Sequence, residues 1–271
     1  MFKFKLDVMG RIATSAIAIL LCACTVSLVT LGIRGLRPGL KVEKADEAPS
    51  LSSPAVLEET PDYGEFYADT IIFIGDTTLY PIKDSGVLPA GSETAQVWSD
   101  ESGSLPLSAS IDRTEIFIPS LEKSAYIADA VSEFKPEYLL LTVGLENGVR
   151  YCTEEQFKEY YTKLIVAIKE ASPDTKIIVN SIFPVSKKYE KKTQGISMGK
   201  IKDANGWLVE IAEAQGVRYL DSISALTSSK GYLKPEYDSG DGLHMNAEGY
   251  AAFMSYVRTH GYKSTLVIDS E

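Results

Sequence analysis

The stretch YLLLTVGLENG, residues 138–148, decides the fold of this chain. Residues 138–143 form a nearly continuous apolar run, which is typical of a strand that is buried on both faces of a parallel sheet. The polar turn at 144–148 would then lie beyond the carboxyl end of that strand. Ligands of doubly wound sheets bind in the crevice at that edge. The sequence therefore indicates this turn as part of a functional site.

Short β-rich runs alternate with amphipathic stretches on both sides of residues 138–143. Strands are expected near 70–74, 95–98, 176–180 and 217–220, and helices near 123–134, 153–171, 200–215 and 247–260. Such alternation predicts a parallel sheet with helices on both faces. We expect an α/β fold: a single domain with a doubly wound, flavodoxin-like parallel sheet in a three-layer α/β/α arrangement, plus one N-terminal transmembrane helix.

The charge of the chain excludes one class of partner. The 271 residues include 27 Lys or Arg and 37 Asp or Glu, which gives a net charge of −10. Residues 1–40 carry five basic side chains and one acidic one, a balance of +4, so residues 41–271 carry −14. An acidic field of this size repels phosphate backbones. We expect no nucleic-acid partner.

An uncharged apolar segment, residues 12–33, lies between Arg11 and Arg34. As a helix it would span about 33 Å, at about 1.5 Å per residue, which matches a hydrocarbon core of about 30 Å. We expect an uncleaved signal anchor that binds the membrane through residues 12–33. A cleaved signal peptide and a lipid-attached Cys24 are the alternatives.

The anchor sets the expected plan of the chain. We expect a cytoplasmic head at 1–11, the transmembrane anchor at 12–33, a flexible stalk rich in Pro, Ser, Ala and Glu at 34–65, and the folded domain at 66–271. Basic residues on both sides of the span leave the positive-inside count undecided. A short head, one span and a large acidic domain nevertheless predict a single-pass cell-membrane protein with its domain on the extracytoplasmic side.

Two histidines, His244 and His260, are available as a general base. His260 lies at the expected end of the last helix, where a cation favours the helix dipole, so we interpret it as a helix-end residue. His244 lies in a turn three residues after Asp241. One short turn can aim the Asp241 carboxylate at the imidazole and hold its tautomer. An incidental histidine beside a turn carboxylate is the alternative.

Three blocks of sequence together resemble the SGNH (GDSL-type) hydrolases. The blocks are FIGDT at 73–77, NSIFPV at 180–185 and DGLHMNAEGY at 241–250. The resemblance covers about residues 68–262. This family places a nucleophilic serine in a Gly-Asp-Ser turn after the first strand, and an Asp-x-x-His block near the C-terminus. The resemblance therefore implies an esterase or deacetylase in which Thr77 attacks, His244 is the base and Asp241 orients it.

Two positions depart from the family pattern. Thr77 replaces the serine, and its extra methyl group restricts χ1 and crowds the attack. Glu146 replaces an Asn whose amide donates to the oxyanion, and loss of one such donor costs about 3–4 kcal/mol. Two hypotheses stay open: a hydrolase, slower than its relatives, and a catalytically silent domain that binds an envelope glycan or a protein partner.

Further residues are expected to support the site. Asn147 and the backbone N–H groups of Thr77 and of a second-block glycine are candidate oxyanion donors. Gly103 is the first choice for that glycine and Gly91 the second. The resemblance implies that Asp76 holds the nucleophile turn by hydrogen bonds. Because the domain is expected to face the cell envelope, we expect an O-acylated glycan or a small ester as substrate.

No cofactor is expected, because the chain has no Walker loop, no G-x-G-x-x-G motif and no zinc-type cysteine pairs. Cys152 is the only cysteine outside the apolar segment, so we interpret it as a partly buried small side chain. We also expect no metal. One formal alternative is a metal held by hard oxygen ligands and one imidazole, from Asp76, Glu146, Asp241 and His244.

Overall fold

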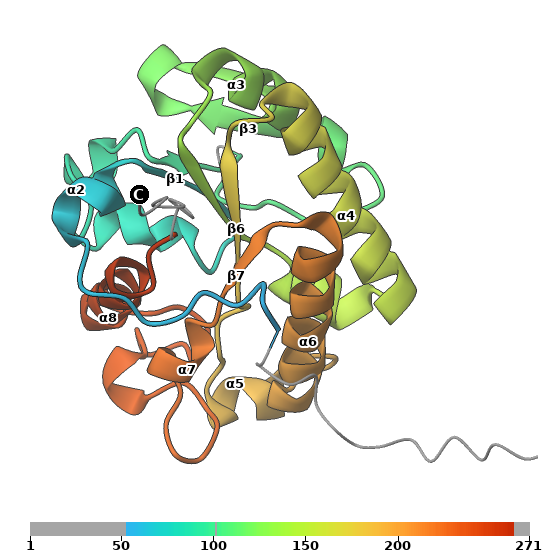
Figure 1. The fold of residues 1–271 in the computed structure, drawn as a ribbon. Helices are drawn as coiled ribbons and strands as arrows, with labels where there is room; N and C mark the ends of the chain where they lie inside the picture. The colour runs from blue at the N-terminus through green and yellow to red at the C-terminus, as the bar shows by residue number, and fades with distance from the viewer. Residues whose placement is uncertain (1–52, 101, 263–271) are drawn as a thin grey trace, which may run out of the picture. The chain divides into compact units, whose positions relative to one another are not determined.

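A five-stranded parallel sheet forms the centre of the computed structural model, which describes residues 53–100 and 102–262 (Figure 1). The strands are β1 (Ile71–Gly75), β2 (Val97–Trp98), β5 (Tyr138–Thr142), β6 (Lys176–Asn180) and β7 (Arg218–Leu220). Their order is β2-β1-β5-β6-β7, and every pairing is parallel. This order is that of a flavodoxin-like, doubly wound sheet. The expected α/β class is confirmed.

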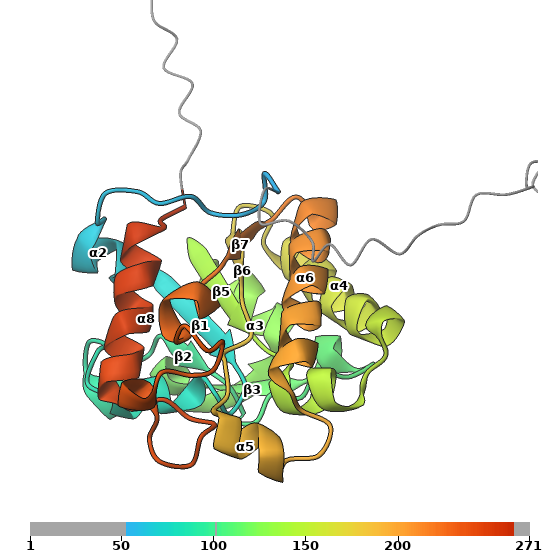
Figure 2. The same ribbon diagram turned by 90° about the horizontal axis from the view of Figure 1, so that it is seen from below.

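Helices cover both faces of the sheet, and Figure 2 shows α2 and α8 on one side and α4 and α6 on the other. The α-helices are α2 (Gly64–Asp69), α3 (Ile127–Phe134), α4 (Glu154–Ala171), α5 (Lys187–Lys192), α6 (Met198–Gln215), α7 (Ile223–Leu226) and α8 (Ala247–Thr259). Short 3-10 helices are η1 (Tyr80–Asp84), η2 (Gly91–Glu93), η3 (Ile111–Arg113), η4 (Pro119–Leu121) and η6 (Pro235–Tyr237), and η5 (Leu145–Val149) is a π-helical turn.

Strand β5 is buried along its whole length because it lies in the middle of the sheet. Leu139 and Leu141 pack into the apolar cluster under α3, α4 and α6, whereas Leu140 packs into the cluster on the opposite face, under α8. Successive side chains of a strand point to opposite faces, so a strand between two helix layers needs apolar residues at every position. This burial on both faces explains why residues 138–143 are a nearly continuous apolar run.

Local sequence sets the ends of the long helices. The Thr153 hydroxyl accepts from the Gln156 N–H, and the Gln156 side chain accepts from the Thr153 N–H, so a capping box begins α4. The Asn246 side chain accepts from the Gly249 N–H at the start of α8. Gly216, at φ +63°, ends α6 in the left-handed conformation. These caps are local, which is why the pattern predicted the helices well.

A β-hairpin replaces the first part of one expected helix. Strands β3 (Glu115–Ile118) and β4 (Lys123–Tyr126) pair antiparallel, so the helix expected at 123–134 begins only at Ile127. Glu122 has φ +50° and lets the chain turn back after β3. The pairing with β3 overrides the helical pattern of these four residues.

The chain from residue 53 onward packs on the domain. Val56 bridges in parallel to Tyr219 of β7. The Leu57 N–H donates to the Tyr219 carbonyl oxygen at 2.8 Å, and the Tyr219 N–H donates to the Ala55 carbonyl oxygen at 2.8 Å. Ala55 and Leu57 are 6% and 4% exposed. This segment therefore covers the outer edge of β7.

The expected stalk at 34–65 is wrong from residue 53 onward, and the domain begins before residue 66. Residues 53–65 contain too few apolar residues to show a helical or strand period. The Pro, Ser, Ala and Glu residues around them therefore made the whole segment resemble a linker. Residues 34–52 lie outside the described residues.

None of the helices within residues 53–100 and 102–262 has the length and apolar character needed to cross a membrane. The expected head at 1–11 and anchor at 12–33 lie outside this part of the chain. Both stay predictions.

Leu57→Ala should lower the free energy of unfolding of the full-length chain by about 2–4 kcal/mol, because the substitution leaves a cavity in the cluster under α8. Urea denaturation followed by circular dichroism measures this loss. The control is Leu121→Ala, whose side chain is 39% exposed and should cost less than about 1 kcal/mol. Equal effects of the two substitutions would contradict the packing of this segment.

Candidate active site

Strand β1 brings the Gly75–Thr78 turn to the carboxyl edge of the sheet, where the Asp76 carboxyl is buried. Oδ1 of Asp76 accepts from the N–H and the hydroxyl of Thr78, at 3.0 and 2.7 Å. Oδ2 accepts from the N–H groups of Gly144 and Leu145, at 3.0 and 3.2 Å. Burial raises the pKa of Asp76 above its ordinary value, because the effect of burial is larger than the lowering by these four hydrogen bonds. Asp76 thus bonds the turn after β1 to the turn after β5.

The Thr77 hydroxyl, the expected nucleophile, does not bond to His244 in this structure. Its Oγ1 atom is buried and has no hydrogen-bond partner among the described residues. A buried hydroxyl without a hydrogen bond costs about 1–3 kcal/mol. The Thr77 backbone N–H has no hydrogen-bond partner in this part of the chain either.

Asp241 and His244 form a bonded pair within one turn. Oδ2 of Asp241 lies 2.6 Å from Nδ1 of His244, and Oδ1 accepts from the N–H groups of Leu243 and His244 at 2.8 and 2.9 Å. Partial burial raises the pKa of Asp241, but these bonds outweigh it and lower that pKa to about 2. The ionised carboxylate assigns the hydrogen to Nδ1, which leaves Nε2 of His244 free to act as a base.

Tyr189 connects the turn after β5 to the Asp241–His244 turn. Its hydroxyl donates to Oε1 of Glu146 at 3.4 Å. Its Cβ would be 3.1 Å from a Cβ placed on Gly242, which has φ +85° and lies between Asp241 and His244. Burial raises the pKa of Tyr189, and the Glu146 charge raises it further, so the hydroxyl keeps its proton and can donate. Tyr189 therefore contacts Glu146 through its hydroxyl and the Asp241–His244 turn through its Cβ.

Helix α8 contacts the turn that contains the expected nucleophile. The Tyr250 hydroxyl donates to the Thr78 carbonyl oxygen at 2.7 Å. Together with the bonds of Asp76 and Tyr189, this contact brings the three expected regions, near positions 77, 146 and 241–244, to one edge of the sheet. Sequence analysis missed Tyr189 and Tyr250, and the only available signal was that each lies in or just after a block that resembles the family.

The two glycines expected as oxyanion donors use their N–H groups elsewhere. Gly103 donates to the Asp100 carbonyl oxygen at 3.0 Å, and Gly91 donates to the Leu88 carbonyl oxygen at 3.2 Å. The expectation for both is wrong in this conformation, because each N–H closes its own tight turn. The Asn147 side chain forms no hydrogen bond among the described residues and is half-buried, so it stays a candidate donor.

The described residues contain no group of three or more side chains arranged to hold a metal ion. Asp76, Glu146, Asp241 and His244, the formal alternative set, are therefore not arranged as a metal site. Their hydrogen bonds instead go to the backbone, to the hydroxyl groups of Thr78, Ser239 and Tyr189, and between Asp241 and His244. The arrangement can move a proton at Nε2 of His244 beside a hydroxyl-bearing turn.

Residues 103–252, more than half of the chain, match the model of the GDSL-like lipase/acylhydrolase family. The chain belongs to this family. The matched residues include Glu146 and the Asp241–His244 turn, and they begin after the Thr77 turn. Membership of the GDSL-like family assigns the chain to the acylhydrolases in general.

Solved structures share the fold of this GDSL-like protein. A candidate acylhydrolase from Bacteroides fragilis is 16% identical with a TM-score of 0.51, over 73% of this chain and 86% of that chain. A candidate platelet activating factor from Streptococcus pneumonia is 20% identical with a TM-score of 0.50, over 70% and 82%. Identities this low show the fold alone. A search of curated protein sequences finds no match to the chain.

The Asp241–His244 bond predicts a pH-dependent stability. Because the pKa of Asp241 is lowered from 3.8 to about 2, its bonds stabilise the folded state above about pH 4, and this stabilisation is lost as the pH falls toward 2. Asp241→Asn should therefore be less stable than wild type near neutral pH, by less than about 1 kcal/mol because solvent screens this half-exposed side chain. The difference should shrink between about pH 4 and 2 in urea denaturation.

The control for this experiment is Asp84→Asn, which removes an exposed carboxylate outside the site. Its difference from wild type should not follow the same pH range. A difference for Asp241→Asn that stays constant down to about pH 2 would contradict the bonded pair.

Proposed function

We propose that this domain is a carboxylic ester hydrolase that removes a short O-acyl group from a cell-envelope glycan or a related small ester. The observation that carries the proposal is the 2.6 Å contact between Asp241 Oδ2 and His244 Nδ1, in a turn linked through Tyr189 and Asp76 to the Thr77 turn. A carboxylate-oriented imidazole beside a hydroxyl is the arrangement that acyl transfer needs.

Each residue has a definite part in the proposed reaction. Thr77 rotates about χ1 and its Oγ1 attacks the acyl carbon while Nε2 of His244 takes the hydroxyl proton. His244 then gives that proton to the departing alcohol oxygen, and Asp241 stabilises the imidazolium that forms between the two transfers. The Thr77 N–H and the Asn147 amide stabilise the oxyanion. Water, activated by His244, releases the acyl group as an acid.

The proposal includes a location. We place the domain outside the cytoplasm, on a membrane anchor formed by residues 12–33, because that apolar segment precedes a long acidic region of charge −14. This location gives the substrate its expected class, an O-acyl group of the envelope. Protease accessibility of the domain in intact cells tests the location, and full protection would contradict it.

A second function is favoured by one observation, the buried Thr77 hydroxyl without a partner. If that hydroxyl stays buried, the domain binds an acylated glycan or an envelope protein without cleaving it. Glu146 supports the same alternative, because a carboxylate near the oxyanion opposes its charge.

Hydrolysis of p-nitrophenyl acetate by the full-length chain separates the two functions. We expect turnover that His244→Ala abolishes, since Nε2 is the proposed base. Thr77→Ser should raise kcat, because the serine hydroxyl lacks the methyl group that restricts χ1. Glu146→Asn should raise kcat by up to about 100-fold, the effect of one added oxyanion donor.

Equal rates for wild type and His244→Ala would contradict the hydrolase for this substrate. Activity that appears only after Thr77→Ser and Glu146→Asn would identify the natural chain as the silent binding domain. His260→Ala is the matched control, because His260 stacks on Tyr256 at the end of α8 and lies outside the proposed machinery.

A further inference from the structure

Glu146 lies between the two halves of the proposed machinery. It is two residues after Gly144, whose N–H is held by Asp76, the neighbour of Thr77. On its other side, its Oε1 accepts from Tyr189, whose Cβ packs beside Gly242 in the Asp241–His244 turn. A half-buried carboxylate therefore lies between the segment bonded to the Thr77 turn and the tyrosine that contacts the Asp241–His244 turn.

No positive side chain neutralises this carboxylate by direct contact. Seven ion pairs occur within residues 53–100 and 102–262, and none includes Glu146 or Asp76. Arg150, one turn further along the chain, lies over the Tyr151 ring, 5.2 Å from its centre, and its charge also acts on the Tyr189 hydroxyl that donates to Glu146, without forming an ion pair with Glu146. Asp241 adds a second carboxylate, paired only with the His244 ring. Glu146 therefore has no ion-pair partner among the described residues, and a carboxylate near the reacting ester opposes the negative charge that develops on its oxygen.

A cation in the substrate would remove this conflict. An ammonium group close to the acyl carbon would pair with Glu146 and offset its repulsion of the oxyanion. Oε1 of Glu146 accepts a long hydrogen bond from Tyr189, at 3.4 Å, and Oε2 has no hydrogen-bond partner among the described residues, so Oε2 is the oxygen we assign to the ligand. A neutral acyl group such as acetyl has nothing to offer this oxygen, and it leaves the charge unpaired.

We propose that Glu146 selects esters whose acyl group carries an ammonium on the carbon next to the carbonyl, that is, aminoacyl esters. This inference rests on the proposed hydrolase and names the acyl class that it accepts. The covalent steps are those of ester hydrolysis. The acyl carbon forms a bond to Thr77 Oγ1, its bond to the alcohol oxygen breaks, and the alcohol leaves with the proton from His244. Water then releases the free amino acid.

Two methyl esters of the same shape test the proposal on the full-length chain. Alanine methyl ester carries the ammonium, and methyl isobutyrate has a methyl group in its place. Acid release near neutral pH, corrected by the rate of His244→Ala, gives kcat/KM for each ester. The ammonium also makes the alanine ester intrinsically more reactive, so the test is the ratio of the two kcat/KM values, which we expect to fall by at least about tenfold from wild type to Glu146→Gln. Glutamine keeps the size and a hydrogen bond to Tyr189 but removes the charge.

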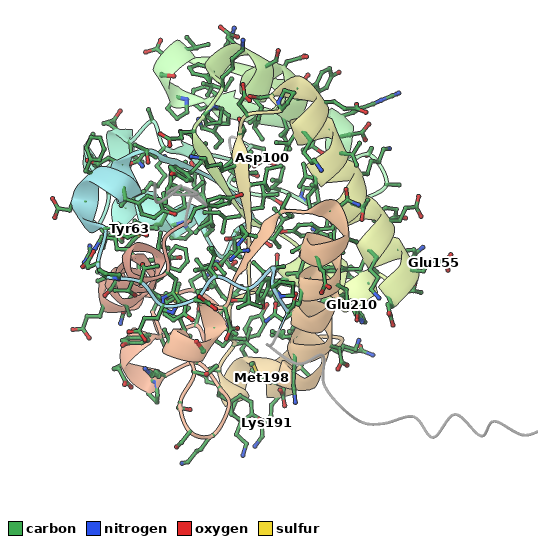
Figure 3. The ribbon with its side chains drawn as sticks, in the orientation of Figure 1. Tyr63, Asp100, Glu155, Lys191, Met198 and Glu210 are labelled. Carbon is green, nitrogen blue, oxygen red and sulfur yellow. The ribbon has the colours of Figure 1, made fainter. Side chains whose placement is uncertain are left out.

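Glu155→Gln is the matched control for the loss of one negative charge. Glu155 is exposed on α4 and points away from the domain, as Figure 3 shows. This variant should keep the preference of wild type. Tyr189→Phe should reduce the preference without reversing it, because the carboxylate stays but loses the bond that orients it. A preference absent in wild type, or unchanged in Glu146→Gln, would overturn the proposal while the hydrolase stands.

A binding measurement decides the case in which neither ester is cleaved. Alaninamide and isobutyramide are uncleaved counterparts of the two esters, and their affinities for wild type and Glu146→Gln can be compared by calorimetry. Preferential binding of alaninamide that is lost in Glu146→Gln would support the ammonium site even though the hydrolase had failed. Equal binding of the two amides, or binding of neither, would overturn it.

Discussion

The Asp76 carboxylate accepts hydrogen bonds from both polar turns of the site, at the centre of the sheet's carboxyl edge. An isolated buried carboxylate is expensive, so the four donors must stay in place while the protein is folded. The turn after β1 and the turn after β5 are thereby fixed to one another. The parallel register of these two strands makes both of them end at the same level of the sheet, so the two turns lie side by side. The positions of Thr77 and Glu146 depend on this bonding.

The sheet was predictable because its central strand is buried on both faces and therefore consists almost entirely of apolar residues. The long helices were predictable because their caps are local. Two segments were not. Lys123–Tyr126 reads as the start of a helix and pairs instead with Glu115–Ile118, and residues 53–65 read as a linker although Ala55 and Leu57 are buried. Both errors involve short pieces whose structure is set by a partner far along the chain, and no pattern within the piece records that partner.

The site, like the fold, was predictable where its contacts are local in the sequence and unpredictable where they are not. Asp241 and His244 lie three residues apart, so one turn could bring carboxylate and ring together, and the sequence alone indicated the pair. The Thr77 rotamer is a property of packing, and so is the use of the Gly103 and Gly91 N–H groups in their own turns. Tyr189 acts through two contacts with distant segments. Spacing predicts which residue types could react, whereas the packed neighbours decide which atoms are free to do so.

Each margin of the parallel sheet is partly covered by another segment of the chain. Residues 55–57 lie along the outer edge of β7, and the β3 hairpin is joined beyond β2 by the bridge between Ser99 and Phe117. Open strand edges offer unpaired backbone groups to a second molecule and are a common origin of self-association. Within the described residues these contacts use backbone groups at both margins of the sheet, so fewer unpaired groups are left there for strand exchange with a second copy.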